Sequence, residues 1–527
     1  MPPDDHEKRK APIRPPIDPA GVDPSEEGGV GALRVRERRS TLSPDGRLTS
    51  GRLAGLTMGG AIWALSWPIM VESFLNSLVG LTDTMLAANL GEAETTAIGA
   101  ASYIMWFIGL IIMAIGVGAT ALVSRAIGRG RSGVANAVLG QTILLSWISG
   151  ILTGVFIAIA ARPVAGLLSL TPEAQTAFDQ YILIIACGVP AASMLFTLIA
   201  CARGAGDSVG PLHAMIFRNV VNIAVSWLLS GVSIYGLKSP LGLDMGVVGI
   251  ALGTVAGDIA GSVMVLGMAL RGQWGIRLRR RWLRPHWHTM RRLVRLGLPN
   301  FLETCGMWIG NFLVIILVGS LAIAQGGGAE LLGIHIVAIR IEAFSFLPGF
   351  AMGAAAATLA GQYLGAGSAA MARAAVWRCT LIALAIMTAF GFAFVLIPGP
   401  IVALISTQPL HLAEVPILLQ ICGAVQIPFA LAIVLRSAMR GAGDVNVTMW
   451  ITWLMTYFVR LPAAFILCGA DLMFTLPSGE AVVLVPNPSP LELGLPGVWL
   501  GLCGELVIRS IAFTWRFLQG GWTRIQV

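Results

Sequence analysis

Charged residues are scarce in this chain. They make up only 12% of its 527 residues, while 56% are hydrophobic, and a soluble globular domain usually carries about 25% charged residues. The mean hydropathy of +0.79 therefore indicates that most of the chain lies in lipid, where only helices or a closed barrel satisfy the backbone. Apolar runs such as 103–123 have the length of a spanning helix and exceed a barrel strand of about 10 residues.

The sequence also lacks the motifs of metal centres and of the common enzyme classes. Its seven cysteines form no C-x-x-C pair and lie in or at the ends of apolar runs, which favours apolar packing over disulfides or zinc. No Walker A sequence, H-E-x-x-H or G-x-S-x-G occurs. We therefore expect a protein that is not an enzyme and needs neither cofactor nor metal.

The net charge of +8 could indicate a nucleic-acid-binding face, but its distribution argues otherwise. Arginines gather at the N-terminus and in short loops between apolar runs, and the loop 271–292 is the richest. This is the pattern of a topology signal, so we expect the lipid bilayer and no nucleic acid as partner. By the positive-inside rule both termini are cytoplasmic, and the loop 469–495 lies outside.

About twelve apolar runs have the length of spanning helices. Their expected limits are 61–88, 97–122, 137–161, 178–201, 212–236, 246–270, 293–322, 332–360, 374–397, 414–437, 447–468 and 496–518. The Pro- and Arg-rich residues 1–55 are expected to form a disordered cytoplasmic tail. The other expected parts are an N-terminal six-helix bundle at 56–270, a basic cytoplasmic linker at 271–292, a C-terminal six-helix bundle at 293–520 and a short cytoplasmic tail at 521–527.

The two expected bundles share a sequence pattern. R-G-A-G-D occurs at Arg203–Asp207 and again at Arg440–Asp444, an offset of 237 residues (440 − 203), and the same offset pairs Gly128 with Gly365. Six spans per repeat is an even number, so both repeats enter the membrane from the same side. This predicts an all-α integral membrane protein of two six-helix bundles, related by a pseudo-two-fold axis along the membrane normal, with a substrate site between them near mid-membrane. In each R-G-A-G-D, the glycines permit a tight turn and the aspartate is expected to cap the next helix.

Six carboxylates fall inside the expected spans, where an ionisable group at the helix centre costs roughly 2.5–3.5 kcal/mol. They are Glu72, Asp83, Asp258, Glu303, Glu342 and Glu505. Asp83 lies deep in the first span, within G-L-T-D-T-M-L, where a carboxylate can exchange a proton or hold Na⁺; a packing role is the alternative. For Glu342 we expect a structural role. For Asp258 and Glu505 the sequence indicates no particular role.

Glu72 and Glu303 occupy equivalent positions in the two repeats. Each follows a proline by four residues, within L-S-W-P-x-x-x-E and L-G-L-P-x-x-x-E. Both lie towards the cytoplasmic ends of their spans, where we expect water to reach them. They are candidates for a gate or for an ion site in the second bundle. A solvated carboxylate near a helix N-terminus is an equally good interpretation.

Together these features resemble the multidrug and toxic compound extrusion (MATE) family. The resemblance covers about residues 56–520 and is carried by P…D-T-x-x-A-x-x-L-G (68–91), by R-G-A-G-D, and by F-L-P-G…A-T-L-A-G-Q-Y-L-G-A-G (346–367). It implies a twelve-helix antiporter of the plasma membrane (the inner membrane of a bacterium). Such a protein, expected here as a monomer, exports amphipathic, often cationic drugs or metabolites in exchange for H⁺ or Na⁺ by alternating access.

The resemblance also implies an ion-coupling site in the first bundle. Asp83 matches the family's acid of the first span, and Asn222 and Thr254 match an Asn and a Thr of its ion site. One turn after Asn222, where many members have an acid, this chain has Ser226, which favours protons over tightly bound Na⁺. Where some members have an acid in the seventh span, this chain has Met307, so we expect no second ion site of that kind.

A flippase for lipid-linked glycans is the alternative function, because the family has flippase relatives of similar helical layout. Such a protein would favour several intramembrane Arg or Lys residues around a cavity for pyrophosphate. The spans of this chain hold few, chiefly Arg218 in the first half and Arg340, Arg460 and Arg509 in the second. We therefore expect the exporter.

Overall fold

The computed structural model describes residues 41–526 with four gaps. Residues 1–40, 168–170, 233–242, 325–329, 476–480 and 527 lie outside the described part, as do some side chains within helices, that of Asp83 among them. In the first half of the chain the helices are α1 (Met58–Ala88), α2 (Glu92–Gly128), α3 (Ser132–Leu167), α4 (Pro172–Gly204), α5 (Val209–Ser230) and α6 (Gly246–Arg271).

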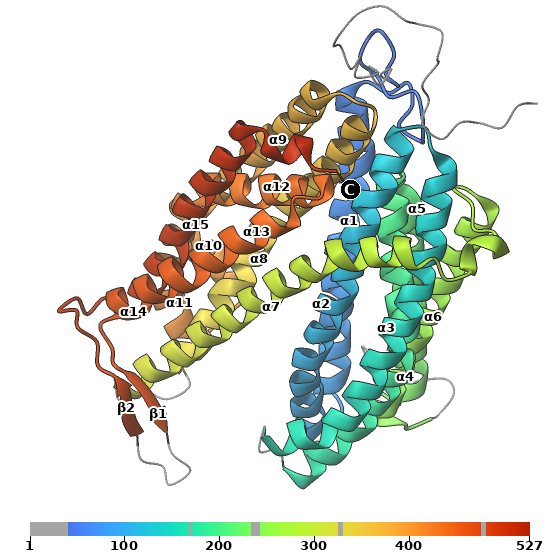
Figure 1. The fold of residues 1–527 in the computed structure, drawn as a ribbon. Coiled ribbons are helices and arrows are strands. Elements are labelled where there is room, and N and C mark those ends of the chain that lie inside the picture. Colours follow the sequence, from blue (N-terminus) through green and yellow to red (C-terminus); the bar gives the residue numbers. More distant parts are fainter. Residues whose placement is uncertain (1–40, 168–170, 233–242, 325–329, 476–480, 527) are drawn as a thin grey trace, which may run out of the picture. The chain divides into compact units, whose positions relative to one another are not determined.

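The second half is also helical (Figure 1). Its α-helices are α7 (Trp287–Ala324), α8 (Glu330–Gly365), α9 (Ala369–Leu396), α10 (Pro398–Ala403), α11 (Pro409–Ala424), α12 (Gln426–Ala442), α13 (Val445–Met455), α14 (Leu461–Cys468) and α15 (Gly494–Gln519). Short helices occur at η1 (Arg280–Leu283), η2 (Thr456–Arg460) and η3 (Gly521–Arg524). The segment η2 is a π-turn that joins α13 to α14, so that Val445–Cys468 forms one candidate span.

Eleven stretches of the described chain are long and apolar enough to cross a membrane, and the pair α11 and α12, bent by 58°, makes a twelfth if it is one broken span. The expected all-α membrane protein is therefore confirmed. The bent pair covers the span expected at 414–437.

Equivalent turns end α4 and α12. Gly206 and Gly443, the second glycines of the two R-G-A-G-D segments, both have φ of +94°, a left-handed conformation that favours glycine. After the first turn, the Gly210 N–H donates a hydrogen bond to the Asp207 carboxylate at 3.3 Å, as expected at a helix start. The same expectation is wrong for Asp444, whose carboxylate makes no capping bond to α13. It instead accepts a hydrogen bond from Arg516 Nε at 2.9 Å.

The two halves meet where α2 approaches α8. Both helices end in a small-x-x-x-small pattern, Ser124 to Gly128 on α2 and Gly361 to Gly365 on α8, and such patterns let helix backbones approach closely. A Cβ on Gly128 would lie 2.0 Å from the Gln362 carbonyl oxygen, and one on Gly365 would lie 2.4 Å from a backbone oxygen of α2. Since Gly128 and Gly365 are equivalent in the repeat, the contact is pseudo-symmetric.

Residues 41–55 differ from the expected disordered tail. In this segment, which we call the strap, Leu42 and Leu48 pair in an isolated β-bridge. Leu48 and Leu53 are each only 2% exposed and belong to an apolar core that includes residues of α8, α9 and α12. Burial of these two leucines fixes the strap, which a composition rich in Pro and Arg does not reveal.

Both the basic linker and the short C-terminal tail contain residues that are buried in the protein. Trp274, Ile276 and Leu278 of the linker are buried in the core of the first half. Trp522, within the expected tail at 521–527, is fully buried and stacks on Phe517 at 5.4 Å between ring centroids. The loop 469–495 contains an antiparallel strand pair, β1 (Leu472–Thr475) with β2 (Ala481–Val485), which the sequence analysis did not predict.

Candidate functional site

A buried polar cluster occupies the interface of α5 and α6. Arg218, Asn222 and Ser226 follow one another at intervals of four along α5, which places them on one helix face. Thr254 and Asp258 have the same spacing on α6. All five residues are buried, so the cluster lies inside the first half.

The three neutral residues of the expected ion site do come together. Asn222 Nδ2 donates a hydrogen bond to Thr254 Oγ1 at 3.1 Å, and Ser226 Oγ donates a longer one to the Ile250 carbonyl at 3.4 Å. The helices touch here because Gly253 has no side chain, since a Cβ at that position would lie 2.0 Å from Ser226 Oγ. Asn222 Oδ1 is buried and has no hydrogen-bond partner among the described residues, so an acceptor is open within the cluster.

Asp83 belongs to α1, but its side chain lies outside the described residues. Its approach to Asn222 and Thr254 therefore stays a prediction. Asp258, for which the sequence indicated no role, has a definite partner. Its carboxylate accepts a hydrogen bond from Arg218 Nε at 2.6 Å within the buried cluster, so its charge is balanced by a guanidinium.

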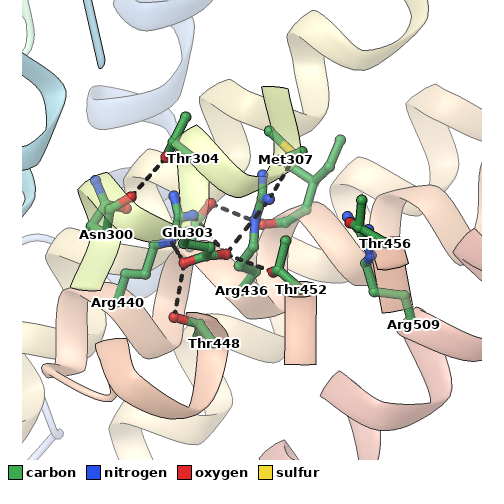
Figure 2. Close-up of polar contacts among 12 residues, drawn as sticks. Asn300, Glu303, Thr304, Met307, Arg436, Arg440, Thr448, Thr452, Thr456 and Arg509 are labelled. Atoms are coloured by element: carbon green, nitrogen blue, oxygen red, sulfur yellow. Dashed lines mark hydrogen bonds and ion pairs between the residues drawn. The ribbon is translucent and has the colours of Figure 1, made fainter. Parts of the chain in front are cut away.

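A second buried polar cluster lies between α7, α12 and α13, and Figure 2 shows it. Glu303 projects from α7 towards two arginines one turn apart on α12, Arg436 and Arg440. Thr448 and Thr452, one turn apart on α13, complete the cluster. The i, i+4 spacing aims both members of each pair at the same carboxylate.

Each oxygen of Glu303 is occupied. Arg440 Nη2 lies 2.8 Å from Oε1, and its Nε donates to Oε2 at 3.1 Å. Thr452 Oγ1 donates to Oε1 at 2.7 Å and Thr448 Oγ1 to Oε2 at 3.2 Å. Arg436 stands at 3.9 Å from the same carboxylate, and its Nε has no hydrogen-bond partner among the described residues. Glu303 is thus saturated by protein donors and offers no free oxygen to a cation.

The first half repeats this pair. Glu72, the equivalent of Glu303, accepts a hydrogen bond from Arg203 at 2.5 Å, and Arg203 is the R-G-A-G-D equivalent of Arg440. Glu72 is 4% exposed and Glu303 0%, so the expectation that water reaches them is wrong. Arg203 and Arg440, the first residues of the two R-G-A-G-D segments, therefore neutralise these two buried carboxylates.

Glu505 forms a third buried group in the second half. Arg509 Nε, one turn along α15, donates to it at 2.5 Å, and Arg460 Nη2 donates at 3.0 Å. Arg460 also bonds Asn311 Oδ1 at 2.8 Å, and Arg509 bonds Thr456 Oγ1 at 3.0 Å. The two glutamates of these clusters therefore face four buried arginines, Arg436, Arg440, Arg460 and Arg509.

Sequence reasoning missed most of the second-half cluster. The sequence indicates no partner for Arg436, Arg440, Thr448 or Thr452, and the two arginines stand at or just beyond the end of the span expected at 414–437. The available signal was the four-residue spacing of both pairs in adjacent helices. The partner Glu303 could not be found this way, because it lies 133 residues before Arg436 (436 − 303) and only the fold brings them together.

The clusters differ in what they can bind. Among the described residues no group of three His, Cys, Asp or Glu side chains could hold a metal ion. In the first-half cluster, Asn222, Ser226 and Thr254 offer neutral oxygens, and Asn222 Oδ1 has no partner among the described residues, which suits a proton carried by a carboxyl group or a monovalent cation. The second-half carboxylates are ion-paired, which suits a structural role or the binding of a negative group to the extra arginine.

Comparison with protein families matches this chain to the MatE model over residues 68–228 and 299–466. Two curated relatives illustrate the match. The probable multidrug resistance protein NorM of Thermotoga maritima is 25% identical over 468 residues, 87% of this chain and 92% of the relative. The multidrug resistance protein PmpM of Pseudomonas aeruginosa is 26% identical over 454 residues, 84% of this chain and 90% of the relative.

Solved structures share the fold. One, described as an outward-facing conformation of a multidrug resistance MATE family transporter of the MOP superfamily, aligns with a TM-score of 0.77 at 20% identity, covering 89% of this chain and 97% of that one. A MOP superfamily transporter from Pyrococcus furiosus, described as having a binding pocket of reverse polarity, aligns with a TM-score of 0.76 at 20% identity over 89% and 97% of the two chains.

Proposed function

Since this chain belongs to the MatE family and is a multi-pass membrane transporter, we propose that it exports amphipathic, chiefly cationic drugs or metabolites in exchange for H⁺ or Na⁺. The relatives NorM and PmpM are both described as multidrug resistance proteins. The observation that carries the coupling proposal is the buried Asn222–Thr254 pair with its open acceptor.

The proposed coupling site consists of Asn222, Thr254 and Asp83. An unpartnered buried amide oxygen is costly, so it gains from any donor or cation placed beside it. A protonated Asp83 or a Na⁺ held by its carboxylate would fill this role. Ser226 supplies a hydroxyl where a second acid would strengthen Na⁺ binding, and its presence favours H⁺.

The transport step is proposed to be alternating access between the two halves. They touch where α2 approaches α8, and cross-half hydrogen bonds join Thr358 Oγ1 to the Arg203 carbonyl at 3.2 Å and Gln362 Nε2 to the Gly204 carbonyl at 3.0 Å. These contacts cluster on the side of the helices that carries both R-G-A-G-D turns, which we call the R-G-A-G-D side. Opening towards this side requires that these contacts break.

By the positive-inside rule, the R-G-A-G-D side is proposed to face the cytoplasm of a bacterial inner membrane, with both termini on that side and the protein acting as a monomer. Reporter fusions near residues 135, 285 and 370 should then report inside, and fusions near 170 and 480 should report outside. An outside signal at 285 would contradict this orientation.

Flipping of a lipid-linked, negatively charged molecule is the second candidate. The observation that favours it is the set of four buried arginines around Glu303 and Glu505, with no hydrogen-bond partner for Arg436 Nε among the described residues. The few arginines within the expected spans give this function little weight, but the burial of Arg436 and Arg440 raises the number of arginines inside the protein.

Transport in proteoliposomes separates these functions. The purified protein is given a cationic dye, and efflux is followed with an imposed proton gradient, an imposed Na⁺ gradient or neither. Antiport predicts dye movement with one gradient that stops when an ionophore dissipates it. Dye movement that survives the ionophore would refute coupling, and gradient-independent translocation of a labelled anionic polyprenyl lipid would favour the flippase.

A further inference from the structure

The segment between α6 and α7 is strongly basic. No acidic residue occurs between Asp258 and Glu303, and this stretch holds nine arginines, Arg271, Arg277, Arg279, Arg280, Arg281, Arg284, Arg291, Arg292 and Arg295. All except the partly buried Arg292 are exposed, and none of them forms an ion pair with an acid of the described chain. We call this group the arginine surface. All nine of its arginines lie outside the residues that match the family.

The backbone beneath the arginine surface is held in place. Trp274, Ile276 and Leu278 point into the core of the first half, while Arg277 and Arg279, which alternate with them, point outward. Side chains of α3 fix the backbone. Asn136 Oδ1 accepts a bond from the Arg277 N–H at 2.7 Å, and Gln141 bonds the backbone of Trp282, Arg284 and His286 at 2.8–2.9 Å.

The start of α7 shows where this surface sits relative to lipid. Trp287, Arg291, Val294 and Leu298 lie along one helix face by their spacing. Trp287 is 77% exposed, and the apolar Val294 and Leu298 are 46% and 52% exposed. An exposed Trp and Arg followed by exposed apolar residues is the pattern of a helix that passes from the headgroup region into hydrocarbon. The arginines before it therefore lie at headgroup level.

We propose that the arginine surface binds the phosphate groups of anionic phospholipids in the adjacent leaflet. Guanidinium groups bind phosphate oxygens through two parallel hydrogen bonds, and basic clusters next to a spanning helix attract anionic lipids. Because the backbone is already fixed, binding orders only side chains. The bound lipid clamps the linker that joins the two halves, so transport should depend on anionic lipid.

Lipid binding can be measured on the whole protein in nanodiscs of phosphatidylcholine that contain a trace of labelled phosphatidylglycerol. Replacement of Arg279, Arg280, Arg281 and Arg284 by Gln should weaken retention of the labelled lipid at least about tenfold, because four charges near the membrane surface are lost. Replacement of the same four by Lys keeps the charge and should retain most of the binding. Arg162→Gln, at an exposed arginine in α3 that lies 3.6 Å from Asp179, is a single-charge control.

The accessibility of a cysteine at position 285 in vesicles shows whether a variant has kept its orientation. Equal retention of labelled lipid by the Gln variant and the unchanged protein, in the same orientation, would overturn the proposal. Inorganic phosphate that competes as well as phosphatidylglycerol would also overturn it, since the site would then bind a free anion.

A separate observation concerns the strap, residues 41–55. Thr41 forms hydrogen bonds with both halves. Its N–H donates to the Ala366 carbonyl after α8 at 3.2 Å, and its hydroxyl donates to the Gly128 carbonyl of α2 at 2.6 Å. Ser50 Oγ donates to the Ile127 carbonyl of α2 at 2.6 Å. Leu53 packs against Gly206 of the first R-G-A-G-D turn, where a Cβ would lie 2.8 Å from its Cγ.

The strap also reaches the linker, since Arg52 Nη1 donates to the Gln273 carbonyl at 2.6 Å. We infer that the strap is a latch that holds the two halves together on the R-G-A-G-D side. The strap must lose its contacts with at least one half whenever the two halves separate on the R-G-A-G-D side. Its loss should therefore shift the protein towards conformations open on that side.

The latch can be tested by the labelling of Thr358→Cys with a membrane-impermeant thiol reagent. Thr358 is 1% exposed and bonds across the halves, and the accessible Cys187 and Cys305 are first replaced by Ser. Leu48→Ser with Leu53→Ser should speed labelling at least about fivefold. Asp45→Asn, at an exposed strap position, should leave the rate unchanged.

Thr41→Val with Ser50→Ala is the milder variant if the leucine variant does not fold, and loss of its two hydrogen bonds should raise labelling in the same direction. Proteolysis after Arg47 reports whether the strap is released. A released strap with an unchanged labelling rate would overturn the latch.

Discussion

At the scale of single residues, the proposed coupling function depends on Asp83. Asp83→Asn keeps the size and hydrogen-bonding capacity of the side chain but removes the charge that titrates. We expect it to abolish gradient-driven efflux while leaving substrate binding, because the neutral amide resembles a permanently protonated site. Efflux in vesicles with matched protein content is the measurement. Normal efflux would place the ion site elsewhere.

The other residues of the proposed coupling site permit graded variants. Asn222→Ala and Thr254→Ala each remove one member of the 3.1 Å hydrogen bond and should impair coupling less than Asp83→Asn. Ser226→Asp adds a second acid to the cluster and should strengthen the dependence of efflux on Na⁺. The choice of these three positions rests on the family resemblance. The structure shows that Asn222, Ser226 and Thr254 lie close to one another.

Glu303 and Arg440 form a second residue-scale test, of stability. Glu303→Gln leaves two buried arginines without their counter-charge, and removal of one partner of a buried pair costs about 3–5 kcal/mol. We expect a marked fall in the melting temperature of the purified protein. Glu330→Gln, at an exposed acid on the neighbouring α8, is the control and should be silent.

The double variant Glu303→Gln with Arg440→Gln removes both charges of the pair. It should recover part of the lost stability, because the two residues interact directly and their effects are not additive. Additive losses would show that the pair is not coupled. An unchanged melting temperature together with lost coupling would instead support an ion-carrying role for Glu303.

At the scale of elements, the contact between α5 and α6 positions the first-half cluster. Gly253→Ala would place a methyl group 2.0 Å from Ser226 Oγ and 2.6 Å from its backbone nitrogen. The helices would have to separate, and overpacking of this kind costs about 1–3 kcal/mol. We expect lower thermal stability and weakened coupling, since Asn222 and Thr254 would move apart.

The same helix supplies a matched control. Gly267 of α6 has nothing within 4 Å of its missing Cβ, so Gly267→Ala should be neutral or slightly stabilising, by about 0.5–1 kcal/mol. Equal melting temperatures for Gly253→Ala and Gly267→Ala would show that α5 and α6 are not packed as described.

At the scale of the whole molecule, the approach of α2 to α8 controls whether the halves can close on the R-G-A-G-D side. Gly128→Leu puts a large side chain where even a Cβ would lie 2.0 Å from the Gln362 carbonyl oxygen. We expect the halves to separate on this side and efflux to stop, because one end state of alternating access is lost. Spin labels at the exposed Val134 and Trp377 should report longer distances.

Gly99→Leu is the control for this experiment, since Gly99 is an exposed residue of α2 with no atom within 4 Å of its missing Cβ. It should leave both the spin-label distances and the efflux unchanged. A distance distribution for Gly128→Leu that matches the unchanged protein would contradict the role of this glycine contact in closure.

The sequence by itself determined the membrane class, the helices and the internal repeat. These follow from local properties, namely apolar run length, arginine in loops, and the recurrence of R-G-A-G-D at a fixed offset. It also determined that Asn222, Ser226 and Thr254 belong together, because a family resemblance carries their positions. The sequence does not reveal the partner of each buried charge. The spacing of residues along one helix shows which of them share a face, but not which other helix packs against that face.

Only the tertiary structure decided those partners. In the structure Glu303 pairs with Arg440, and Glu72 pairs with Arg203. These two carboxylates, which we expected water to reach, are therefore buried in ion pairs. It fixed the strap through two buried leucines and contacts to both halves. The physical reason is the same in each case: burial and charge neutralisation depend on residues far apart in the sequence, such as Glu72 and Arg203, and only the packed helices place them in contact.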